Sequence, residues 1–337
     1  MKKIMVFLLL MFFLAGCSKK DSLNVKNEFV NMVNHTKSYK LVGKMELIGD
    51  EETFNYTIDV SYLEKDYYKV EMVNTTNEHK QIILKNDDGL YVVTPSLNKS
   101  FKFESTWPDN SSQAYILASL VKDIEKDTES TVNANNDGYI IQNKVNYPNN
   151  DDLKYQKIYL DNKLNIQKVE VYGDADLPKI KVVFEDVDLK AGLKPKEFEL
   201  SNFVTSNECS EENCKTEQTL SKIESAIYPL YMPANTYLSS SEVITTEDDS
   251  RVILTFSGER NFVIVEENAS INESHEVIPV YGEPLMLNDT IAALSNNSMY
   301  WTSNSIDYYI VSDDLSVSEM VFIASSLGNA QATIAPK

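Results

Sequence analysis

The sequence predicts a mainly β protein of the α+β class, with a second, smaller α+β domain. Most of the chain consists of short runs in which apolar and polar residues alternate, separated by turns rich in Asn, Asp and Gly. Such short separators favour antiparallel hairpins over the longer crossovers that parallel strands need. The length of 337 residues exceeds what one domain usually holds, so a second domain is expected.

The amino terminus predicts a signal peptide over residues 1–16. Two lysines precede an almost unbroken apolar run at residues 4–14, which is too short to cross a hydrocarbon core of ~30 Å as a helix. The closing Leu-Ala-Gly-Cys resembles the lipobox of bacterial lipoproteins. This resemblance implies that the Cys17 thiol carries diacylglycerol, that residues 17–23 form a lipidated tether, and that the protein is anchored at the extracytoplasmic face of the cell membrane. The alternative is an ordinary cleaved signal with a chance cysteine.

The chain is strongly acidic, with a formal charge of −20. Nucleic acids and anionic lipid headgroups would be repelled by such a surface, so no nucleic-acid partner is expected. The sequence contains no second apolar segment of membrane-spanning length. We therefore expect attachment to the membrane through Cys17 alone.

Two further cysteines, Cys209 and Cys214, lie in a polar segment at residues 201–227 that is predicted to be a linker. Outside the cytoplasm a close pair most simply forms a disulfide, with free thiols and a metal site as alternatives. A metal site would need more ligands at suitable spacing, and the nearest histidine, His275, is far along the chain. The sequence predicts no metal and no cofactor.

The first domain is expected to span residues 24–200. Apolar residues at helical spacing predict a helix over residues 22–34, and a second helix is expected after Trp107, capped within residues 109–113 and burying Leu117. The alternating runs predict strands at residues 39–48, 53–63, 67–73, 81–84, 90–93, 101–103, 138–142, 153–160, 166–172, 180–184 and 197–200.

The second domain is expected to span residues 228–328. It closes with a short helix over residues 317–327, for which Ser316 is a suitable cap, and residues 329–337 are expected to form a flexible tail. Its strands are predicted at residues 251–256, 261–265, 276–281, 298–302 and 306–311.

Three stretches within residues 24–200 carry a family resemblance. Residues 88–98, the block at 101–117 and the hairpin at 158–171 resemble the LolA/LolB lipoprotein-carrier superfamily, and the middle block is similar to Gram-positive sporulation and germination lipoproteins. The resemblance implies a curved antiparallel half-barrel with helices plugging its concave side and an apolar cavity for acyl chains. It also implies the two-domain plan of the RseB/MucB stress regulators. Soluble carriers are not anchored, so receptor, sensor or adaptor roles gain weight here.

Signatures of enzymatic chemistry are missing from the sequence. There is no Gly-x-Ser-x-Gly, and the three histidines, His35, His79 and His275, occur in unrelated polar segments without a partner pattern. Residues 133–138 mimic a calcium loop, but Lys144 occupies the position of the bidentate Glu, which indicates a simple turn. A non-enzymatic protein is expected.

Aromatic residues provide the remaining candidate site. A cavity wall is predicted from the aromatic run and the helix after it, and sheet or core packing of the same residues is the alternative. Strand alternation places Tyr91 and Val93 on one face and Leu90 and Val92 on the other. The predicted wall consists of Tyr91, Val93, Phe101, Phe103, Trp107, Tyr115 and Leu117.

Two functions are expected from these observations. The first is a surface lipoprotein that binds an acyl chain, a lipidated peptide or an apolar peptide in the half-barrel cavity. The alternative is a protein–protein adaptor, or a regulator of envelope stress or germination, that uses the same fold as a docking surface for an envelope protein.

Overall fold

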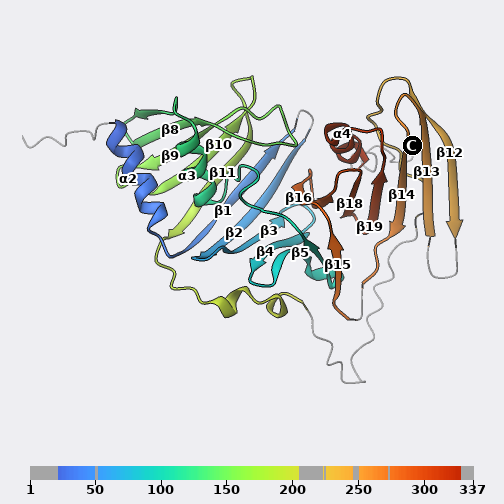
Figure 1. Cartoon of the computed structure of the whole chain (residues 1–337), viewed down its shortest axis with the longest axis horizontal. Helices are drawn as coiled ribbons and strands as arrows, with labels where there is room; N and C mark the ends of the chain where they lie inside the picture. The colour runs from blue at the N-terminus through green and yellow to red at the C-terminus, as the bar shows by residue number, and fades with distance from the viewer. Residues whose placement is uncertain are drawn as a thin grey trace, which may run out of the picture.

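The computed structural model describes residues 22–49, 52–204, 223, 225–245, 250–271 and 274–327. The signal peptide, Cys17, the Cys209 and Cys214 pair and the tail at residues 329–337 lie outside these ranges. Two open sheets, both rich in antiparallel pairs, make up the described part of the chain (Figure 1). The predicted fold class, mainly β with helices, is confirmed.

The first sheet has twelve strands in the order β15-β6-β5-β4-β3-β2-β1-β11-β10-β9-β8-β7. Neighbouring strands are antiparallel, except that β15 runs parallel to β6. The strands are β1 (Ser38–Ile48), β2 (Thr53–Leu63), β3 (Tyr67–Asn74), β4 (Lys80–Asn86), β5 (Gly89–Thr94), β6 (Lys99–Phe103), β7 (Thr131–Ala134), β8 (Gly138–Lys144), β9 (Tyr155–Asp161), β10 (Ile166–Tyr172), β11 (Pro178–Asp188) and β15 (Glu276–Val280).

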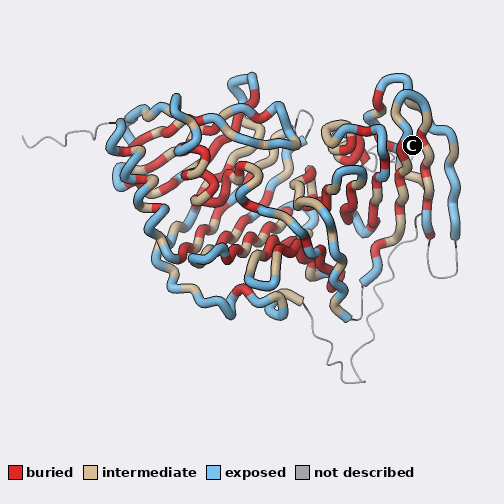
Figure 2. The backbone as a smooth tube through the Cα atoms, in the orientation of Figure 1, coloured by how far each residue is buried: buried red, intermediate tan, exposed pale blue. Residues whose placement is uncertain are grey.

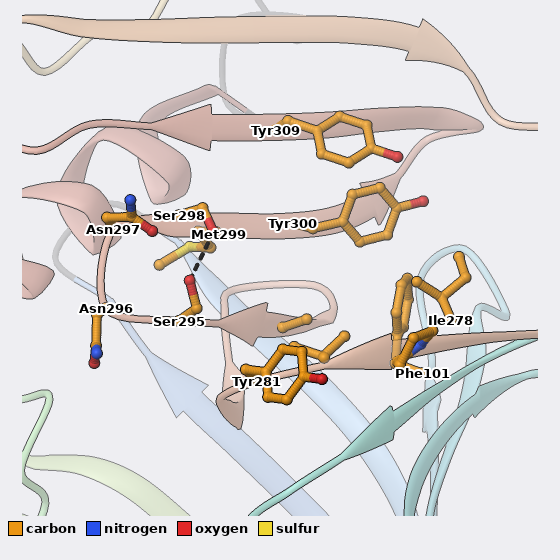
Figure 3. A pocket seen from close by; sticks show the side chains of 13 residues that line it. Phe101, Ile278, Tyr281, Ser295, Asn296, Asn297, Ser298, Met299, Tyr300 and Tyr309 are labelled. Carbon is orange, nitrogen blue, oxygen red and sulfur yellow. Dashed lines mark hydrogen bonds between the residues drawn. The ribbon is translucent and has the colours of Figure 1, made fainter.

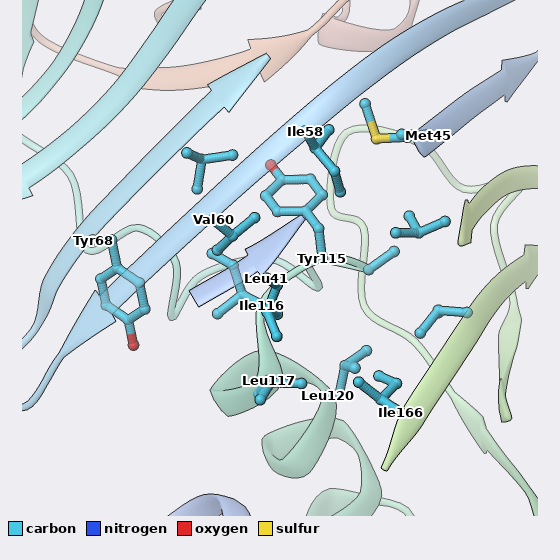
Figure 4. Packing of buried hydrophobic residues seen from close by; sticks show 14 of the residues in the cluster. Leu41, Met45, Ile58, Val60, Tyr68, Tyr115, Ile116, Leu117, Leu120 and Ile166 are labelled. Carbon is cyan, nitrogen blue, oxygen red and sulfur yellow. The ribbon is translucent and has the colours of Figure 1, made fainter. Parts of the chain in front are cut away.

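Helices α2 (Ser22–Asn34) and α3 (Leu117–Lys126) pack against each other and cover one face of this sheet at β7 and β8. Phe29 of α2 and Leu117 and Leu120 of α3 are fully buried against apolar strand residues such as Leu41 and Ile58 (Figure 4). Burial of this apolar surface is the main source of stability for the unit.

The opposite face of β3, β4 and β5 is covered by the chain that follows β11. Phe198 packs edge-on against Tyr67, with 5.7 Å between ring centroids, in a cluster that also holds Ile82 and Leu84. The prediction of a strand at residues 197–200 is wrong, because the chain forms two 3-10 helices there, η3 (Pro195–Phe198) and η4 (Leu200–Asn202). Pro195 fixes the first helical residue of η3 and favours this turn.

The second sheet has seven strands in the order β12-β13-β14-β19-β18-β17-β16. Helix α4 (Val317–Leu327) packs on one face through Met320 and Ile323. Ser316 caps α4 as predicted, because its hydroxyl accepts the Glu319 N–H while the Glu319 carboxylate accepts the Ser316 N–H. The strands are β12 (Thr236–Thr245), β13 (Ser250–Gly258), β14 (Phe262–Asn268), β16 (Glu283–Met286), β17 (Ile291–Leu294), β18 (Ser298–Ser303) and β19 (Ile306–Val311).

Helix α3 begins later than the sequence predicts. Its N-cap is Ile116, which has no capping side chain, and the expected cap residues serve other purposes. Asp109 accepts a hydrogen bond from Lys122 at 2.7 Å, and Ser112 accepts the Asn146 N–H at 2.8 Å. The polar residues after Trp107 therefore build a turn that is tied to neighbouring segments.

Buried polar contacts join the two sheets. Tyr56 of β2 donates to the carbonyl of Asn288 at 2.6 Å. The side-chain oxygen of Gln81, in β4, accepts the Ile291 N–H at 2.6 Å and the Thr290 hydroxyl at 3.1 Å. Strand β15 lies beside β6, so the carboxy-terminal half of the chain supplies the outermost strand of the first sheet. The domain boundaries at residues 200 and 228 stay predictions.

Candidate functional site

A pocket of about 470 Å³ opens where the two sheets meet (Figure 3). We call it the inter-sheet pocket. Its volume is within the range of about 300–1,000 Å³ that is common for small-molecule sites. It is lined by Phe101, Ile278, Pro279, Val280, Tyr281, Ala293, Ser295, Asn296, Asn297, Ser298, Met299, Tyr300 and Tyr309.

Strand pairing assembles the apolar wall of the pocket. The parallel register of β15 on β6 sets Ile278 beside Phe101. In the second sheet the antiparallel register aligns Ala293, Tyr300 and Tyr309 on neighbouring strands, so their side chains share one face. The Phe101 ring meets the Tyr300 ring edge-on at 4.7 Å between centroids, and Tyr300 lies 4.3 Å from Tyr309. Three aromatic rings therefore form a continuous apolar surface across the junction.

The other end of the pocket is polar and uncharged. Residues 295–297 connect β17 to β18, and the hydroxyls of Ser295 and of Ser298, the first residue of β18, lie 2.7 Å apart. Asn296 and Asn297 are exposed, and the Asn297 amide donates to the Asp313 carboxylate at 3.2 Å. The residues lining the pocket include no Lys, Arg or His.

A buried ion pair holds Tyr300 in the wall. The Lys99 ammonium lies 2.9 Å from the Asp307 carboxylate and donates to the Tyr300 hydroxyl at 2.9 Å. Thr302 donates to the second Asp307 oxygen at 2.5 Å. Burial and the nearby Asp307 charge raise the pKa of Tyr300 well above its usual value, so the phenol stays neutral. The network fixes the orientation of the Tyr300 ring.

The seven residues of the predicted cavity wall do not come together. Phe101 lines the inter-sheet pocket, and Phe103, Trp107, Tyr115 and Leu117 are buried among the side chains that α2 and α3 pack against the first sheet. Tyr91 and Val93 lie in the cluster on the opposite face. The predicted alternation is confirmed, since Leu90 and Val92 belong to the helix-covered face.

The register explains this division. Phe101 pairs with Val92 and Phe103 with Leu90, and directly paired residues in antiparallel strands point to the same side. Tyr91 and Val93 therefore face away from Phe101. The wall residues that the sequence did not indicate, such as Ile278, Ala293, Tyr300 and Tyr309, come from the carboxy-terminal half. Strand alternation predicts most of their strands but carries no information on which sheet they join.

One serine–histidine contact resembles the pairs found in catalytic sites, but its serine is buried. The Ser100 hydroxyl lies 2.9 Å from the His275 Nε2. Ser100 is fully buried in β6, so a substrate has no access to its oxygen. Burial lowers the pKa of His275, which favours a neutral ring. We interpret the contact as part of the attachment of β15 to the first sheet.

Among the described residues, no group of three or more His, Cys, Asp or Glu side chains is placed to hold a metal ion. Within these residues, no helix has the length and apolar character needed to span a membrane.

These features define a two-sheet β protein with an apolar pocket at the junction. The chain belongs to the YdcC-like sporulation protein family, whose model, described as sporulation protein YdcC-like, matches residues 1–198. Sporulation protein YdcC of Bacillus subtilis (strain 168) is 32% identical over 321 residues, covering 95% of this chain and 94% of that protein. The resemblance to sporulation proteins predicted from the sequence is confirmed.

The solved structures that match this chain are more distant. The Pseudomonas aeruginosa MucA/MucB complex matches 88% of this chain and 97% of that chain, at 10% identity and a TM-score of 0.31. A structure described as an outer membrane lipoprotein-sorting protein domain from Vibrio parahaemolyticus matches 52% of this chain and 95% of that chain, at 13% identity and a TM-score of 0.30. Family membership rests on the sequence matches alone.

Proposed function

We propose that this sporulation-family protein is a membrane-anchored, non-enzymatic lipoprotein that binds an acyl chain, or a lipidated or apolar peptide, in the inter-sheet pocket. The pocket is the observation that carries the proposal. Its size and its wall of Phe101, Tyr300 and Tyr309 suit an apolar ligand. The helix-covered face of the first sheet is a poorer candidate, because Phe29 and Leu120 already occupy it.

Burial of ligand methylene groups would supply the affinity. Each contributes about 0.8 kcal/mol, and association itself costs about 4–15 kcal/mol in lost freedom of motion. A chain of many methylenes is therefore needed for useful binding. A long acyl tail meets this requirement better than a short apolar side chain.

Anchoring and the absence of catalysis are parts of the same proposal. The sequence around Cys17 supports lipidation at the extracytoplasmic face of the membrane, and a tethered protein holds its ligand close to the bilayer. The buried position of Ser100 supports a non-enzymatic role for the Ser100–His275 contact.

A fluorescent monoacylglycerol provides the test. Residues 18–337, purified without detergent, should bind it saturably, and Ala293→Phe should abolish binding by filling the pocket. Tyr281→Ala, at a residue that is 78% exposed, should weaken binding without any risk to folding. Leu177→Phe is the matched control, because Leu177 is 74% exposed and lies outside the pocket. Absence of binding by the unmodified protein, or full binding by both pocket variants, would refute the proposal.

A second candidate function, docking of an envelope protein, is favoured by strand β12. This strand forms one edge of the second sheet, and Tyr237, Val243 and Ile244 are exposed along it (Figure 2). Soluble proteins usually protect such edges with charges, whereas β12 carries only Glu242. A partner could add a strand here through backbone hydrogen bonds.

Site-specific photo-crosslinking in sporulating cells tests this second candidate. A photoreactive residue at Val243 should yield an adduct with one protein, and the same residue at Leu177 should not. If the Val243 position gives no adduct, docking at β12 loses its support.

A further inference from the structure

We infer that the inter-sheet pocket selects acyl ligands whose polar end is uncharged, such as a glyceryl ester or an amide, over ligands that end in a carboxylate or phosphate. This inference rests on the proposed acyl-binding function. The inference concerns the polar end of the pocket, where residues 295–298 meet solvent. Its evidence is the neutral, hydrogen-bonding character of the side chains at this end.

The groups at this end are neutral and hydrogen-bonding. The Ser295 and Ser298 hydroxyls and the Asn296 and Asn297 amides each offer both donors and acceptors. A glyceryl or amide headgroup also carries both, so it can pair with them without an unmatched charge. The apolar rings of Phe101 and Tyr300 lie at the other end, where the acyl tail would be placed.

The described residues that line the pocket include no cation that could compensate an anionic headgroup. Lys99, which contacts the wall residue Tyr300, is already paired with Asp307. Lys102 of β6 lies over the Tyr91 ring, on the face of the sheet that points away from Phe101. A carboxylate or phosphate in the pocket would have to replace its water shell with neutral dipoles alone.

Negative charge beside the polar end adds repulsion. The Asp313 carboxylate accepts a hydrogen bond from the Asn297 amide at 3.2 Å, so it neighbours one of the residues that line this end of the pocket. The whole chain carries a formal charge of −20, which also disfavours the approach of anions. The Asp313 carboxylate and the negative charge of the chain both disfavour an anionic headgroup.

Competition against the fluorescent monoacylglycerol tests the inference. We compare an unlabelled monoacylglycerol, a fatty acid and a long-chain alkylamine, which is a cation at pH 8, all of equal chain length. The monoacylglycerol should displace the probe at a concentration on the order of tenfold lower than the fatty acid does, since unpaired charge burial is costly. Asn296→Lys should reduce this preference for the neutral ligand, because Asn296 is exposed and lines the pocket. Leu177→Lys controls for the added charge and should keep the preference.

The outcomes separate this inference from the proposed function. If none of the three ligands displaces the probe and the probe itself does not bind, acyl binding fails and the inference falls with it. If the fatty acid competes as well as the monoacylglycerol, acyl binding stands and the inference is overturned. Tightest binding of the alkylamine would also overturn it, because Asp313 would then select a cation.

Discussion

The Lys99 ammonium in β6 lies 2.9 Å from the Asp307 carboxylate in β19, and only 5% and 7% of the two side chains is exposed. This pair crosses from one sheet to the other beside the inter-sheet pocket. Buried pairs of this kind contribute less than their Coulomb attraction suggests, but removal of one partner leaves a buried charge without compensation.

Lys99→Met is therefore expected to lower the free energy of unfolding by about 3–5 kcal/mol. Urea unfolding followed by tryptophan and tyrosine fluorescence measures the loss. The double variant Lys99→Met/Asp307→Asn should recover much of it, because no unpaired charge then remains. Lys44→Met is the control, since the Lys44–Glu185 pair is exposed and should contribute less than about 1 kcal/mol. Equal losses for the two single variants would contradict the prediction.

Glu266 makes stability depend on pH. Burial raises the pKa of its carboxyl to about 7 from an ordinary value of 4.5, although the Ile227 N–H bonded to it acts in the opposite direction. The folded state therefore binds more protons than the unfolded state between these two values, and stability falls as pH rises through this window. Asp123, whose pKa burial raises to about 6, should add a similar fall at lower pH.

Glu266→Gln is expected to remove the fall between about pH 5 and 7 and to stabilise the protein at pH 8 by about 2–3 kcal/mol. The amide oxygen can still accept the Ile227 N–H. Thermal unfolding across this pH range provides the measurement. Leu177→Gln, at an exposed residue that does not titrate, should leave the pH profile unchanged. An unaltered slope in Glu266→Gln would show that another group titrates in this range.

Phe29 tests the packing on the helix-covered face of the first sheet. It is fully buried, so Phe29→Ala should cost about 3–5 kcal/mol of stability, whereas Leu23→Ala, at a residue that is 61% exposed, should cost under about 0.5 kcal/mol. The folded Phe29→Ala protein should still bind the fluorescent monoacylglycerol with unchanged affinity. A gain in affinity would instead place the ligand in the space that Phe29 vacates.

Cys17→Ala tests the anchor. We expect the variant to be released from membranes or to remain an uncleaved precursor, with no incorporation of labelled fatty acid. Fractionation and metabolic labelling measure both effects. Cys209→Ala controls for the loss of a thiol and should stay in the membrane fraction. Continued labelling of Cys17→Ala would contradict lipidation at this position.

Local patterns in the sequence were sufficient for much of the fold. Helix α2 and the long strands β1 and β2 follow from apolar periodicity, which depends only on near neighbours. Strand β12 was missed because it buries neither face, so its sequence lacks the alternation that marks a half-buried strand. The short strands β16 and β17 offer too few residues for a pattern to emerge.

The pocket could not be predicted from local sequence patterns, because it depends on which strands pair and in which register. Phe101 lies in the wall of the inter-sheet pocket, but its neighbours Ile278 and Tyr300 reach it only through the pairing of β15 with β6 and the contact between the sheets. Tyr91 was grouped with Phe101 because both are aromatic and close in sequence. The register of β5 on β6 determines that they face opposite ways, and register is a property of the assembled sheet.

Strand β15 also determines where this chain can be divided. A fragment that stops at residue 200 lacks β15, which leaves β6 with unpaired backbone groups along one side and Phe101 uncovered. Such an edge invites pairing with other molecules, so the fragment should self-associate even if the rest of it folds. Addition of residues 225–327 as a separate polypeptide should cover this edge and give a complex with one copy of each fragment. Pairing of β15 with β6 should then hold the two halves together without a continuous backbone between them.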